Sequence, residues 1–378
     1  RDDDAKGKWR WKISAGKHVA ALIQALGIQL QQVTPSGSVS TKKEILEGLV
    51  DVPFVRDLLV FRENDKLLSV FVWQMFDRFV DGNLIQSGFA DADDRIHPII
   101  NVHKISGRWA TYEPVVSNVP KAKLKRMPDG SKKIVRPNLR RQIKARPGRK
   151  FVGFDFSALE MRVIAQLSGD PFLCDIFINN KDIHAACSRV VFPNFDQLAK
   201  DEAKQVRDRT KPLVYATAYG ANPETCWKGL LKEGYNVKLA DVTAAIGKIM
   251  ARMSGVVRWQ RKQIATASTP PYTISSMILG RRRVWPMGQI EATEALNSGV
   301  QFSGSDIMNI GMAQMEARLI DRGYKEAFGI VQVHDAAVYE CWAEDAEDLA
   351  ADVKDCYEQE HTINGVTMIY PVEIHIGD

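Results

Sequence analysis

The hydrophobic and polar positions of residues 151–170 predict a short buried strand followed by an amphipathic helix. The apolar strand begins at Phe151 and brings Asp155 to its end. Ser157 is a favourable N-cap for a helix over residues 158–167. We therefore expect Asp155 to be exposed at a strand end but held in a fixed position.

A second pair of apolar runs, in GIVQVHDAAVYE, flanks His334 and Asp335 as the strands of a hairpin would. If this hairpin lies beside the first strand in one sheet, Asp155 and Asp335 share a site. Two such close carboxylates repel each other, so a site that keeps both ionised favours divalent cations, and oxygen ligands suit Mg²⁺. The alternative is that each Asp is an ordinary turn or cap residue.

The segment between these strands contains a predicted helix with Arg207, Lys211, Tyr215 and Tyr219 at intervals of four residues. Each step of four turns about 40° beyond a full circle and rises roughly 6 Å, so the four side chains form one stripe. Two cations followed by two aromatic rings are suited to a triphosphate and then a base. An ordinary amphipathic helix with a solvated basic end is the alternative.

Residues 1–86 are predicted to be largely helical. A first helix is expected in GKHVAALIQALG, a turn in TPSGS, and a capping box of Thr41 and Glu44 at the start of a second helix. Pro53 opens a third predicted helix, which runs to about residue 80. Its aromatic residues are expected in the core: Trp73, Phe76 and Phe79.

The rest of the chain predicts an α+β protein. Residues 176–292 are mostly helical in pattern, with His184 at the start of a helix. After them we expect a helix over 305–322, the hairpin, a helix over 345–360 and a final strand, VEIHIG.

Composition adds the size and class of the protein. A chain of 378 residues exceeds the usual size of a single core, so two or three subdomains are expected. No run of about 18 apolar residues occurs, so no membrane span is predicted. The five cysteines show no metal-binding spacing, which favours reduced thiols in an intracellular protein. The expected compartment is the cytoplasm or nucleoid, with an organelle as the alternative. The chain begins at Arg1 rather than Met, which indicates a piece of a longer or processed protein.

The positive charge is concentrated in residues 119–150, which hold 13 Lys or Arg and one acid. Their net charge of +12 exceeds the +5 of the whole chain, so the other residues carry −7. Such a block is either a solvated arm or a surface for a phosphate backbone, and its place before the Asp155 strand favours the second. Within it, MPDGSKK predicts a hairpin turn, and PNLRRQIKA a short helix that brings Arg140 and Arg141 near the site.

Three segments also have recognisable sequences: DFSALEMRVIAQLSGD, RDRTKPLVYATAYG and VQVHDAAVYE. In order and spacing they resemble motifs A, B and C of the family A (polymerase I-like) DNA polymerases. Further matching stretches include SGRWATYEPVVSNVP, DIHAA, LGRRRVWP and LNSGVQFSGSDIM, and the matches together span about residues 38–376. An ordered set of this kind is far more specific than one motif.

The resemblance implies a right-hand polymerase fold with an antiparallel-sheet palm and mostly helical thumb and fingers. The implied subdomains are the thumb at 1–86, the palm at 87–175 and 293–378, and the fingers at 176–292. The implied function is a template-directed DNA polymerase that adds dNTPs to a primer 3′-hydroxyl group, with primer-template DNA as its partner. Since no exonuclease-like Asp-x-Glu element precedes the thumb-like region, no proofreading is expected in this chain.

The resemblance further implies a site for two Mg²⁺ ions, bridged by Asp155 and Asp335 with the Phe156 carbonyl oxygen as an extra ligand. One ion would lower the pKa of the primer hydroxyl group and place it for attack on the α-phosphate. The other would hold the triphosphate and neutralise the pyrophosphate. Lys211, the third expected catalytic residue, would meet the phosphates and protonate the pyrophosphate.

Other residues would hold the nucleotide and the DNA. By resemblance, Arg207 would bind the terminal phosphate and His184 would be a further phosphate contact. Tyr215 would stack on the incoming base, and Tyr219, hydrogen-bonded to Glu160, would border the templating base. The residues expected to contact the primer-template are Arg108, Arg140, Arg141, Arg282, Arg283, Asn297, Gln301 and His334.

The metal site departs from the family's pattern at one position. The family's His-Asp-Glu triplet is completed here by Ala336, so one carboxylate is missing beside Asp335. Glu340 cannot replace it easily, because five residues along a strand separate it from Asp335 by about 16 Å.

Three further departures lie outside the metal ligands. Pro212 follows Lys211 and lacks the N–H group of a helix interior, so we expect that helix to kink or to begin late. Ala158 stands where Gln is common, and Thr293 stands where Arg is common. Both replacements are expected to weaken sensing of the DNA minor groove.

Two other functions share parts of this pattern. A single-subunit RNA polymerase would have the same palm and metals, but Glu160 disfavours a ribose 2′-hydroxyl group. A non-catalytic DNA-binding relative would be expected to have lost Asp155, Lys211 or Asp335, and all three are present.

Overall fold

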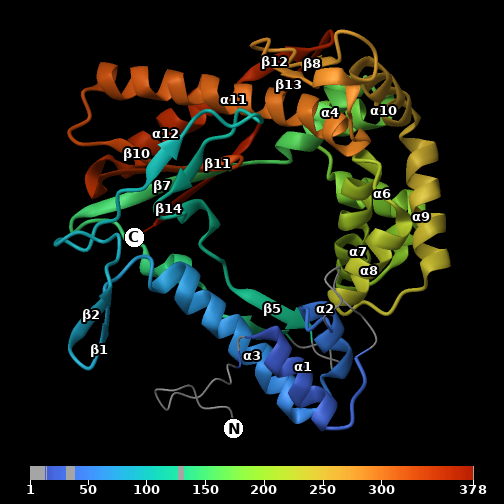
Figure 1. Cartoon of the computed structure of the whole chain (residues 1–378). Coiled ribbons are helices and arrows are strands. Elements are labelled where there is room, and N and C mark those ends of the chain that lie inside the picture. Colours follow the sequence, from blue (N-terminus) through green and yellow to red (C-terminus); the bar gives the residue numbers. More distant parts are fainter. Residues whose placement is uncertain (1–12, 14, 31–38, 127–131, 378) are drawn as a thin grey trace. The chain divides into compact units, whose positions relative to one another are not determined.

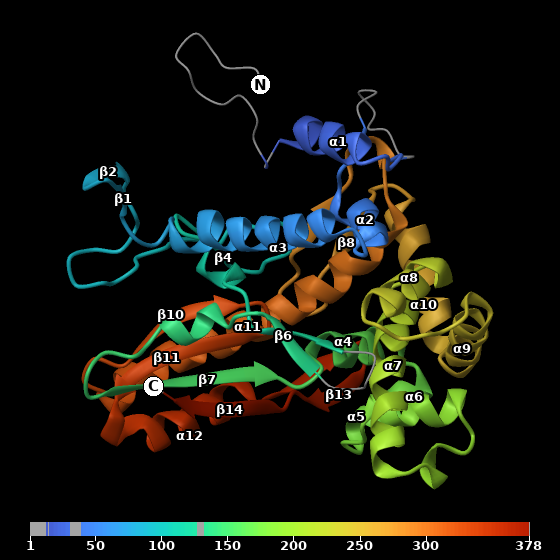
Figure 2. The same cartoon turned by 90° about the horizontal axis from the view of Figure 1, so that it is seen from below.

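The computed structural model describes residues 13, 15–30, 39–126 and 132–377 (Figures 1 and 2). The chain forms two compact units, Arg1–Pro98 and Ile99–Asp378. Helices and antiparallel strand pairs occur in both, which confirms the predicted α+β class. Within the described ranges, no helix combines the length and the apolar character needed to cross a membrane.

The first unit is built on a small helical core. Its helices are α1 (Gly16–Ala25), α2 (Lys43–Leu46), a 3₁₀-helix (Glu47–Leu49) and α3 (Pro53–Leu67). Val19 and Ile23 lie one helical turn apart on α1 and pack with Leu46, Val55 and Leu58. The first predicted helix is thus confirmed, whereas the predicted TPSGS turn lies outside the described residues.

The predicted capping box is wrong. α2 begins at Lys43, and the N-cap residue Lys42 makes no side-chain cap hydrogen bond. The hydroxyl oxygen of Thr41 instead accepts a hydrogen bond of 3.4 Å from Arg62 of α3. A tertiary contact therefore uses the side chain that the sequence assigned to the cap.

The third predicted helix is too long. α3 ends at Leu67, a π-helical turn follows (Leu68–Val72), and the chain then forms a hairpin of β1 (Arg78–Val80) and β2 (Asn83–Gln86). Its turn is Asp81-Gly82, with φ angles of 49° and 78°, a conformation that Asp-Gly adopts readily in tight hairpins. Phe76 and Phe79 are 44% and 59% exposed, so their expected place in the core is also wrong.

A four-stranded antiparallel sheet lies at the centre of the second unit (Figure 2). Its order is β10 (Phe328–Val333), β11 (Ala336–Trp342), β7 (Arg149–Phe156) and β14 (Val372–Gly377). The predicted strand, the predicted hairpin and the predicted final strand are therefore confirmed, and all three meet in one sheet. In the register of the sheet, Asp155 lies between Ala336 on one side and Glu373 on the other.

Helices account for most of the remainder of this unit. Their bounds are α4 (Leu159–Ser168), α5 (Pro171–Ile178), α6 (Ile183–Val191), α7 (Lys200–Ala218), α8 (Pro223–Lys232), α9 (Leu239–Arg252), α10 (Ser254–Ala267), α11 (Ala292–Arg322) and α12 (Ala346–Tyr357). Figure 1 shows α6, α7, α8 and α9 as one group, and the contacts among them agree. The helical pattern predicted between residues 176 and 292 is confirmed.

Shorter elements connect these parts. The two-stranded pairs are β3 (Ile99–Asn101) with β4 (Ala110–Tyr112), β5 (Lys123–Arg126) with β6 (Lys132–Arg136), β8 (Thr273–Ser275) with β9 (Arg282–Val284), and β12 (Glu360–Ile363) with β13 (Val366–Ile369). The 3₁₀-helices are Val116–Asn118, Leu139–Gln142, Phe195–Gln197, Pro286–Gly288 and Ala343–Asp345. β5 and β6 pair as the predicted hairpin requires, although its turn lies outside the described residues.

The alternation of side chains along β7 separates core from solvent. Val152, Phe154 and Phe156 are buried, and the ring of Phe154 lies 4.0 Å from that of Tyr357 on α12. Asp155, between two of these anchors, points to the opposite face and is exposed. The core on one side of the sheet therefore fixes the position of a carboxylate on the other.

The predicted cap of α4 is wrong, and so is one of the two outcomes predicted for Pro212. Ser157 does not cap α4. Its N–H group donates to the Pro371 carbonyl oxygen at 2.8 Å and extends the pairing with the β14 side. Ala158 takes the N-cap position instead, with a φ of 55° and no side-chain cap bond. α7 does not begin late at Pro212, because the helix starts at Lys200 and continues through the proline. The alternative outcome, a kink at Pro212, stays a prediction.

Candidate active site

The two predicted carboxylates lie at neighbouring strand ends. Asp155 is on β7, and Asp335 is in the two-residue turn between β10 and β11. The N–H group of Phe156 donates to the carbonyl oxygen of Asp335 at 3.0 Å, which ties this turn to β7. His334 takes a φ of 59°, a backbone conformation that is unusual for a residue with a side chain. The tight turn thus brings Asp335 beside the end of β7.

The charges at this end of the sheet act on one another. Surrounding protein atoms partly desolvate Asp155 and raise the pKa of its carboxyl group, and the charge of Asp335 raises it further. Glu373 acts in the same direction, whereas Lys121 and His375 oppose it. A bound cation lowers the electrostatic repulsion among such closely placed carboxylates.

The available ligands fit Mg²⁺ as it is usually bound. Asp155 and Phe156 line one pocket, and Asp335 is held beside Phe156 by the backbone bond. In the described ranges, no three or more His, Cys, Asp or Glu side chains form a closed metal cage. Mg²⁺ typically uses one or two carboxylates and completes its octahedron with water and substrate phosphates, so the open arrangement fits this ion.

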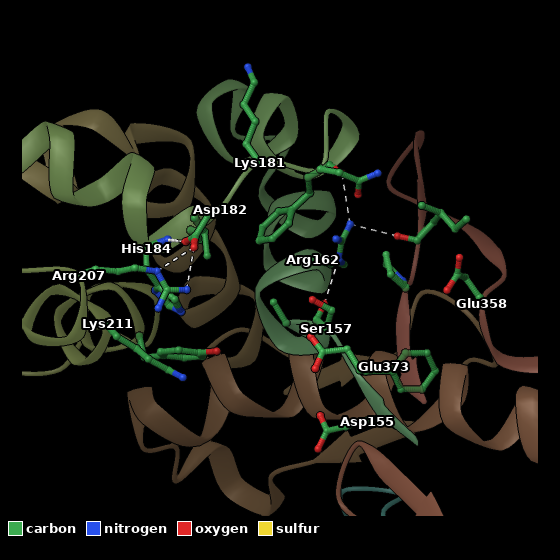
Figure 3. Close-up of a pocket in the computed structure, with 18 residues that line it drawn as sticks. Asp155, Ser157, Arg162, Lys181, Asp182, His184, Arg207, Lys211, Glu358 and Glu373 are labelled. Carbon is green, nitrogen blue, oxygen red and sulfur yellow. Dashed lines mark hydrogen bonds and ion pairs between the residues drawn. The ribbon is translucent and has the colours of Figure 1, made fainter. Parts of the chain in front are cut away.

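A pocket of about 670 Å³ joins the sheet to α6 and α7 (Figure 3). Acidic residues at its sheet side are Asp155 and Glu373, and basic residues at its helical side are Arg207 and Lys211. A pocket with acids on one wall and cations on another can hold a polyanion together with a metal cation.

The stripe predicted on α7 lies partly in this pocket. Arg207, Lys211 and Tyr215 line it, and Tyr219 lies just past the last helical residue. Arg207 pairs with Asp182 at 2.7 Å, and Asp182 also caps α6 by accepting from the N–H groups of His184 and Ala185. One carboxylate therefore fixes the guanidinium group and the start of α6.

His184 is buried, 7% exposed, at the start of α6 and lines the same pocket. Burial, together with the nearby charges of Lys211 and Arg207, lowers the pKa of His184 to about 4, so its ring is neutral at pH 7. Its Nδ1 atom finds no hydrogen-bond partner among the described residues. The ring contacts Tyr215, with 5.9 Å between the ring centroids.

Glu160, in the first turn of α4, connects two of the predicted site residues. Its Oε2 accepts a hydrogen bond of 2.7 Å from the hydroxyl group of Tyr219, which confirms the predicted bond. Its Oε1 accepts one of 2.7 Å from Arg108. Burial and the charge of Glu160 raise the pKa of Tyr219, so its hydroxyl group stays protonated and donates. Arg108, which is expected to contact the DNA, is thus held by Glu160, which is expected to lie near the sugar of the incoming nucleotide.

The residues predicted to contact DNA fall into separate places within the second unit. Arg283, Asn297 and Gln301 line a second pocket of about 320 Å³, and Arg283 pairs with Glu294 at 2.8 Å. Arg282 lies on the same short strand, β9, and is exposed.

Three more of the predicted DNA contacts lie nearer the central sheet. Arg140 and Arg141 are on the 3₁₀-helix Leu139–Gln142, where Nε of Arg140 donates to the Val119 carbonyl oxygen at 2.7 Å. His334 is exposed in the turn beside Asp335.

The charged pocket residues that the sequence analysis did not predict are Arg162, Lys181, Asp182, Glu358 and Glu373. Asp182 carried a detectable signal, because an Asp two residues before His184 is a favourable N-cap. Arg162 donates to the carbonyl oxygens of Ser157, Phe177 and Ile369, partners that only the folded chain brings together.

Known proteins share both the sequence and the fold of this chain. The family model for DNA polymerase family A matches residues 6–378. DNA polymerase I of Chloroflexus aurantiacus is 27% identical over 331 residues, which cover 85% of this chain and 32% of that protein. The thermostable DNA polymerase I of Thermus aquaticus is 27% identical over 367 residues, which cover 94% of this chain and 40% of that protein.

A solved structure is similar along nearly the whole chain. It is the POL domain of Pol1 from M. smegmatis in complex with DNA primer-template and dNTP, with a TM-score of 0.76, 22% sequence identity, and coverage of 97% of this chain and 60% of that chain. This likeness confirms the predicted polymerase fold. The chain spans 32% and 40% of the lengths of the two curated relatives above. Because the family model matches almost every residue, the chain belongs to DNA polymerase family A.

Proposed function

We propose that this chain is a template-directed DNA polymerase that adds dNTPs to the 3′-hydroxyl group of a primer. One observation carries the proposal: a single pocket joins Asp155, at the strand end beside Asp335, to Arg207, Lys211 and Tyr215 on α7. The M. smegmatis relative was solved with a DNA primer-template and a dNTP, and we assign the same classes of ligand to this chain.

In the proposed reaction the primer hydroxyl oxygen forms a bond to the α-phosphorus of the dNTP. The bond from that phosphorus to the oxygen bridging the β-phosphorus breaks, pyrophosphate leaves, and the hydroxyl proton passes to solvent. Two Mg²⁺ ions, held by Asp155, Asp335 and the Phe156 carbonyl oxygen, would supply charge neutralisation and an acidified primer hydroxyl group. Most of the catalytic gain then comes from positioning and electrostatics.

The chain's own cations hold the substrate in this proposal. Arg207, fixed by Asp182, binds the terminal phosphate, and Lys211 meets the inner phosphates and protonates the leaving pyrophosphate. His184 is neutral, so it acts as a hydrogen-bonding group toward phosphate rather than as a cation. Tyr215 stacks on the incoming base.

Sugar choice falls to Glu160 and Tyr219. Both carboxylate oxygens of Glu160 are already engaged, by Arg108 and by Tyr219. A ribose 2′-hydroxyl group at this position would clash with Glu160 or break its bond to Tyr219. This arrangement favours a DNA polymerase over a single-subunit RNA polymerase.

The subdomain assignment is part of the proposal. We assign residues 1–86 to a thumb, 87–175 and 293–378 to a palm, and 176–292 to fingers. The palm then contains the central sheet, and the fingers contain α7. Primer-template DNA would contact the residues expected from the sequence: Arg108, Arg140, Arg141, Arg282, Arg283, Asn297, Gln301 and His334.

A primer-extension assay tests the proposal. With Mg²⁺ and dNTPs the protein should lengthen a labelled primer on a template, whereas rNTPs should be incorporated much more slowly. The same labelled primer with a mismatched end, incubated without dNTPs, should keep its length if these 378 residues carry no proofreading. If the protein extends no primer with either dNTPs or rNTPs, the proposal is wrong and the alternative of a non-catalytic DNA-binding protein is favoured.

A further inference from the structure

A row of three side chains crosses the sheet at the active-site end. Antiparallel pairing sets Ala336 of β11 opposite Asp155 of β7, and Glu373 of β14 opposite Asp155 on its other side. Directly opposite residues in antiparallel strands project from the same face, with Cβ atoms about 5 Å apart. Ala336, Asp155 and Glu373 therefore share one face, and Glu373 mirrors Ala336 across Asp155.

Position 336 is where the family's motif C pattern has a Glu and this chain has Ala. The next acid along β11 cannot serve in its place. Glu340 is 4% exposed, accepts from the backbone N–H group of Arg146 at 2.7 Å and pairs with the Arg146 side chain at 3.0 Å. Glu340 is thus committed to a structural contact away from Asp155.

Glu373 has the opposite properties. It is exposed and lines the same pocket as Asp155, and Figure 3 shows both carboxylates at the sheet side of that pocket. Among the described residues, no hydrogen bond or ion pair engages its carboxylate. Its charge nevertheless reaches Asp155, on which it acts electrostatically.

A separate feature of the pocket indicates that a ligand fills it. His184, 7% exposed, lines the pocket with Nδ1 lacking a partner among the described residues. A buried polar atom without a partner is costly, and a bound phosphate group or its water would satisfy this one.

We propose that Glu373 supplies the carboxylate that Ala336 lacks, from the other side of Asp155, and thereby raises the affinity of the site for a divalent cation bound with a nucleotide. The proposal rests on the proposed function. In this proposal Asp155 and Asp335 hold the cation, and Glu373 acts on it through its charge. It is a positioning residue for the cation, not a catalytic one.

The test measures cation binding without turnover. Mn²⁺ is titrated into the protein with a dNTP and no primer, and bound Mn²⁺ is followed by electron paramagnetic resonance. Glu373→Gln should weaken Mn²⁺ binding about tenfold, a charge effect of about 1.4 kcal/mol. Primer extension should show a matching rise in the Mg²⁺ concentration for half-maximal rate, with kcat at saturating Mg²⁺ changed much less.

The double variant Ala336→Glu with Glu373→Gln is the decisive comparison. By returning a carboxylate to the other side of Asp155, it should restore Mn²⁺ affinity to within about threefold of wild type. Glu360→Gln, which removes the same charge at an exposed position outside the pocket, is the matched control and should bind Mn²⁺ as wild type does.

Unchanged Mn²⁺ binding by Glu373→Gln would overturn the proposal. So would a loss that Ala336→Glu does not repair, since that would assign Glu373 a role in folding or in another contact. If wild type binds Mn²⁺ and dNTP but extends no primer, the proposed function fails while the Mn²⁺ titrations still decide the role of Glu373.

Discussion

The hydroxyl group of Tyr219 donates a hydrogen bond of 2.7 Å to Oε2 of Glu160, across 59 residues of sequence. The bond joins the end of α7 to the first turn of α4. Under the proposed function it also closes the place where a ribose 2′-hydroxyl group would lie. A structural contact and a choice of substrate therefore depend on the same carboxylate.

Glu160→Ala should lower the selection for dNTPs over rNTPs. A ribonucleotide in wild type breaks the bond between the partly buried Glu160 and Tyr219 at a cost of about 1 to 3 kcal/mol, and the variant has no such bond to lose. The ratio of kcat/KM for dNTP over rNTP should fall by roughly ten- to a hundredfold. Glu224→Ala, an exposed acid on α8, is the control and should keep the wild-type ratio.

Asp155→Asn and Asp335→Asn should each reduce primer extension by at least about a thousandfold, because each removes a negative charge from the proposed metal site. Metal-free Asp155→Asn should be at least as stable as wild type at pH 7, since the change relieves repulsion from Asp335. Thermal unfolding and duplex DNA binding are measured for both variants. Wild-type values in both assays would show that a variant is folded and has lost only its catalytic activity. Near-wild-type extension by either variant would refute the assignment of these ligands.

His184 should make stability depend on pH. Its pKa is about 4 in the folded protein against 6.5 as the ordinary value, so the unfolded chain binds a proton that the folded chain refuses. The free energy of unfolding should thus fall by about 3 kcal/mol as the pH drops from 6.5 to 4. Denaturant unfolding at several pH values measures the fall, and His184→Gln should show less of it. Equal pH dependence in both proteins would contradict the neutral buried ring.

Tyr215→Phe should raise discrimination against dideoxynucleotides. The Tyr215 hydroxyl group is kept protonated, because burial and the charges of Glu160 and Asp335 raise its pKa. It can then donate toward the phosphates where a missing 3′-hydroxyl group would have done so. A hydrogen bond to a charged group is worth about 1.5 to 3 kcal/mol, so the kcat/KM ratio of dNTP over ddNTP should rise by about tenfold or more. If Tyr215→Phe leaves the kcat/KM ratio of dNTP over ddNTP unchanged, the Tyr215 hydroxyl group does not lie near the phosphates of the bound nucleotide.

The basic segment at 119–150 should set the salt dependence of DNA binding. Arg141 and Lys144 are exposed there, and changing both to Ala should flatten the slope of log affinity against log salt by up to about 1.8, or about 0.9 per lost phosphate contact. The effect should not depend on DNA sequence. Lys232 and Lys238, exposed on and after α8, form a control pair. An unchanged slope would favour the solvated-arm alternative.

Local patterns predicted the parts of the fold that are local. The alternation around Asp155 and the apolar runs flanking His334-Asp335 each describe one element and its end, and both are found as expected. The error beyond Val72 has a local cause as well, since the predicted helix runs into the strand that precedes the Asp81-Gly82 turn. A tight-turn pair outweighs apolar spacing when the apolar run is short.

The site could be predicted only where a motif or a spacing pointed to it. Glu373 and Asp155 are 218 residues apart, and only the pairing of β14 with β7 places them side by side. The bond from the Ser157 N–H group to the Pro371 carbonyl oxygen likewise depends on this pairing. Contacts set by sheet order leave no mark in the sequence around either partner.

Pro212 divides α7 between the residues proposed to hold phosphates and those proposed to meet the base. With no N–H group at this position, the carbonyl oxygen one turn earlier lacks its usual partner, and a helix bends most easily at such a point. We therefore expect the two halves of α7 to change their mutual angle without unwinding. A nucleotide that touches Lys211 on one side and Tyr215 on the other would select a single angle, so that the shape of α7 would itself report whether the pocket is filled.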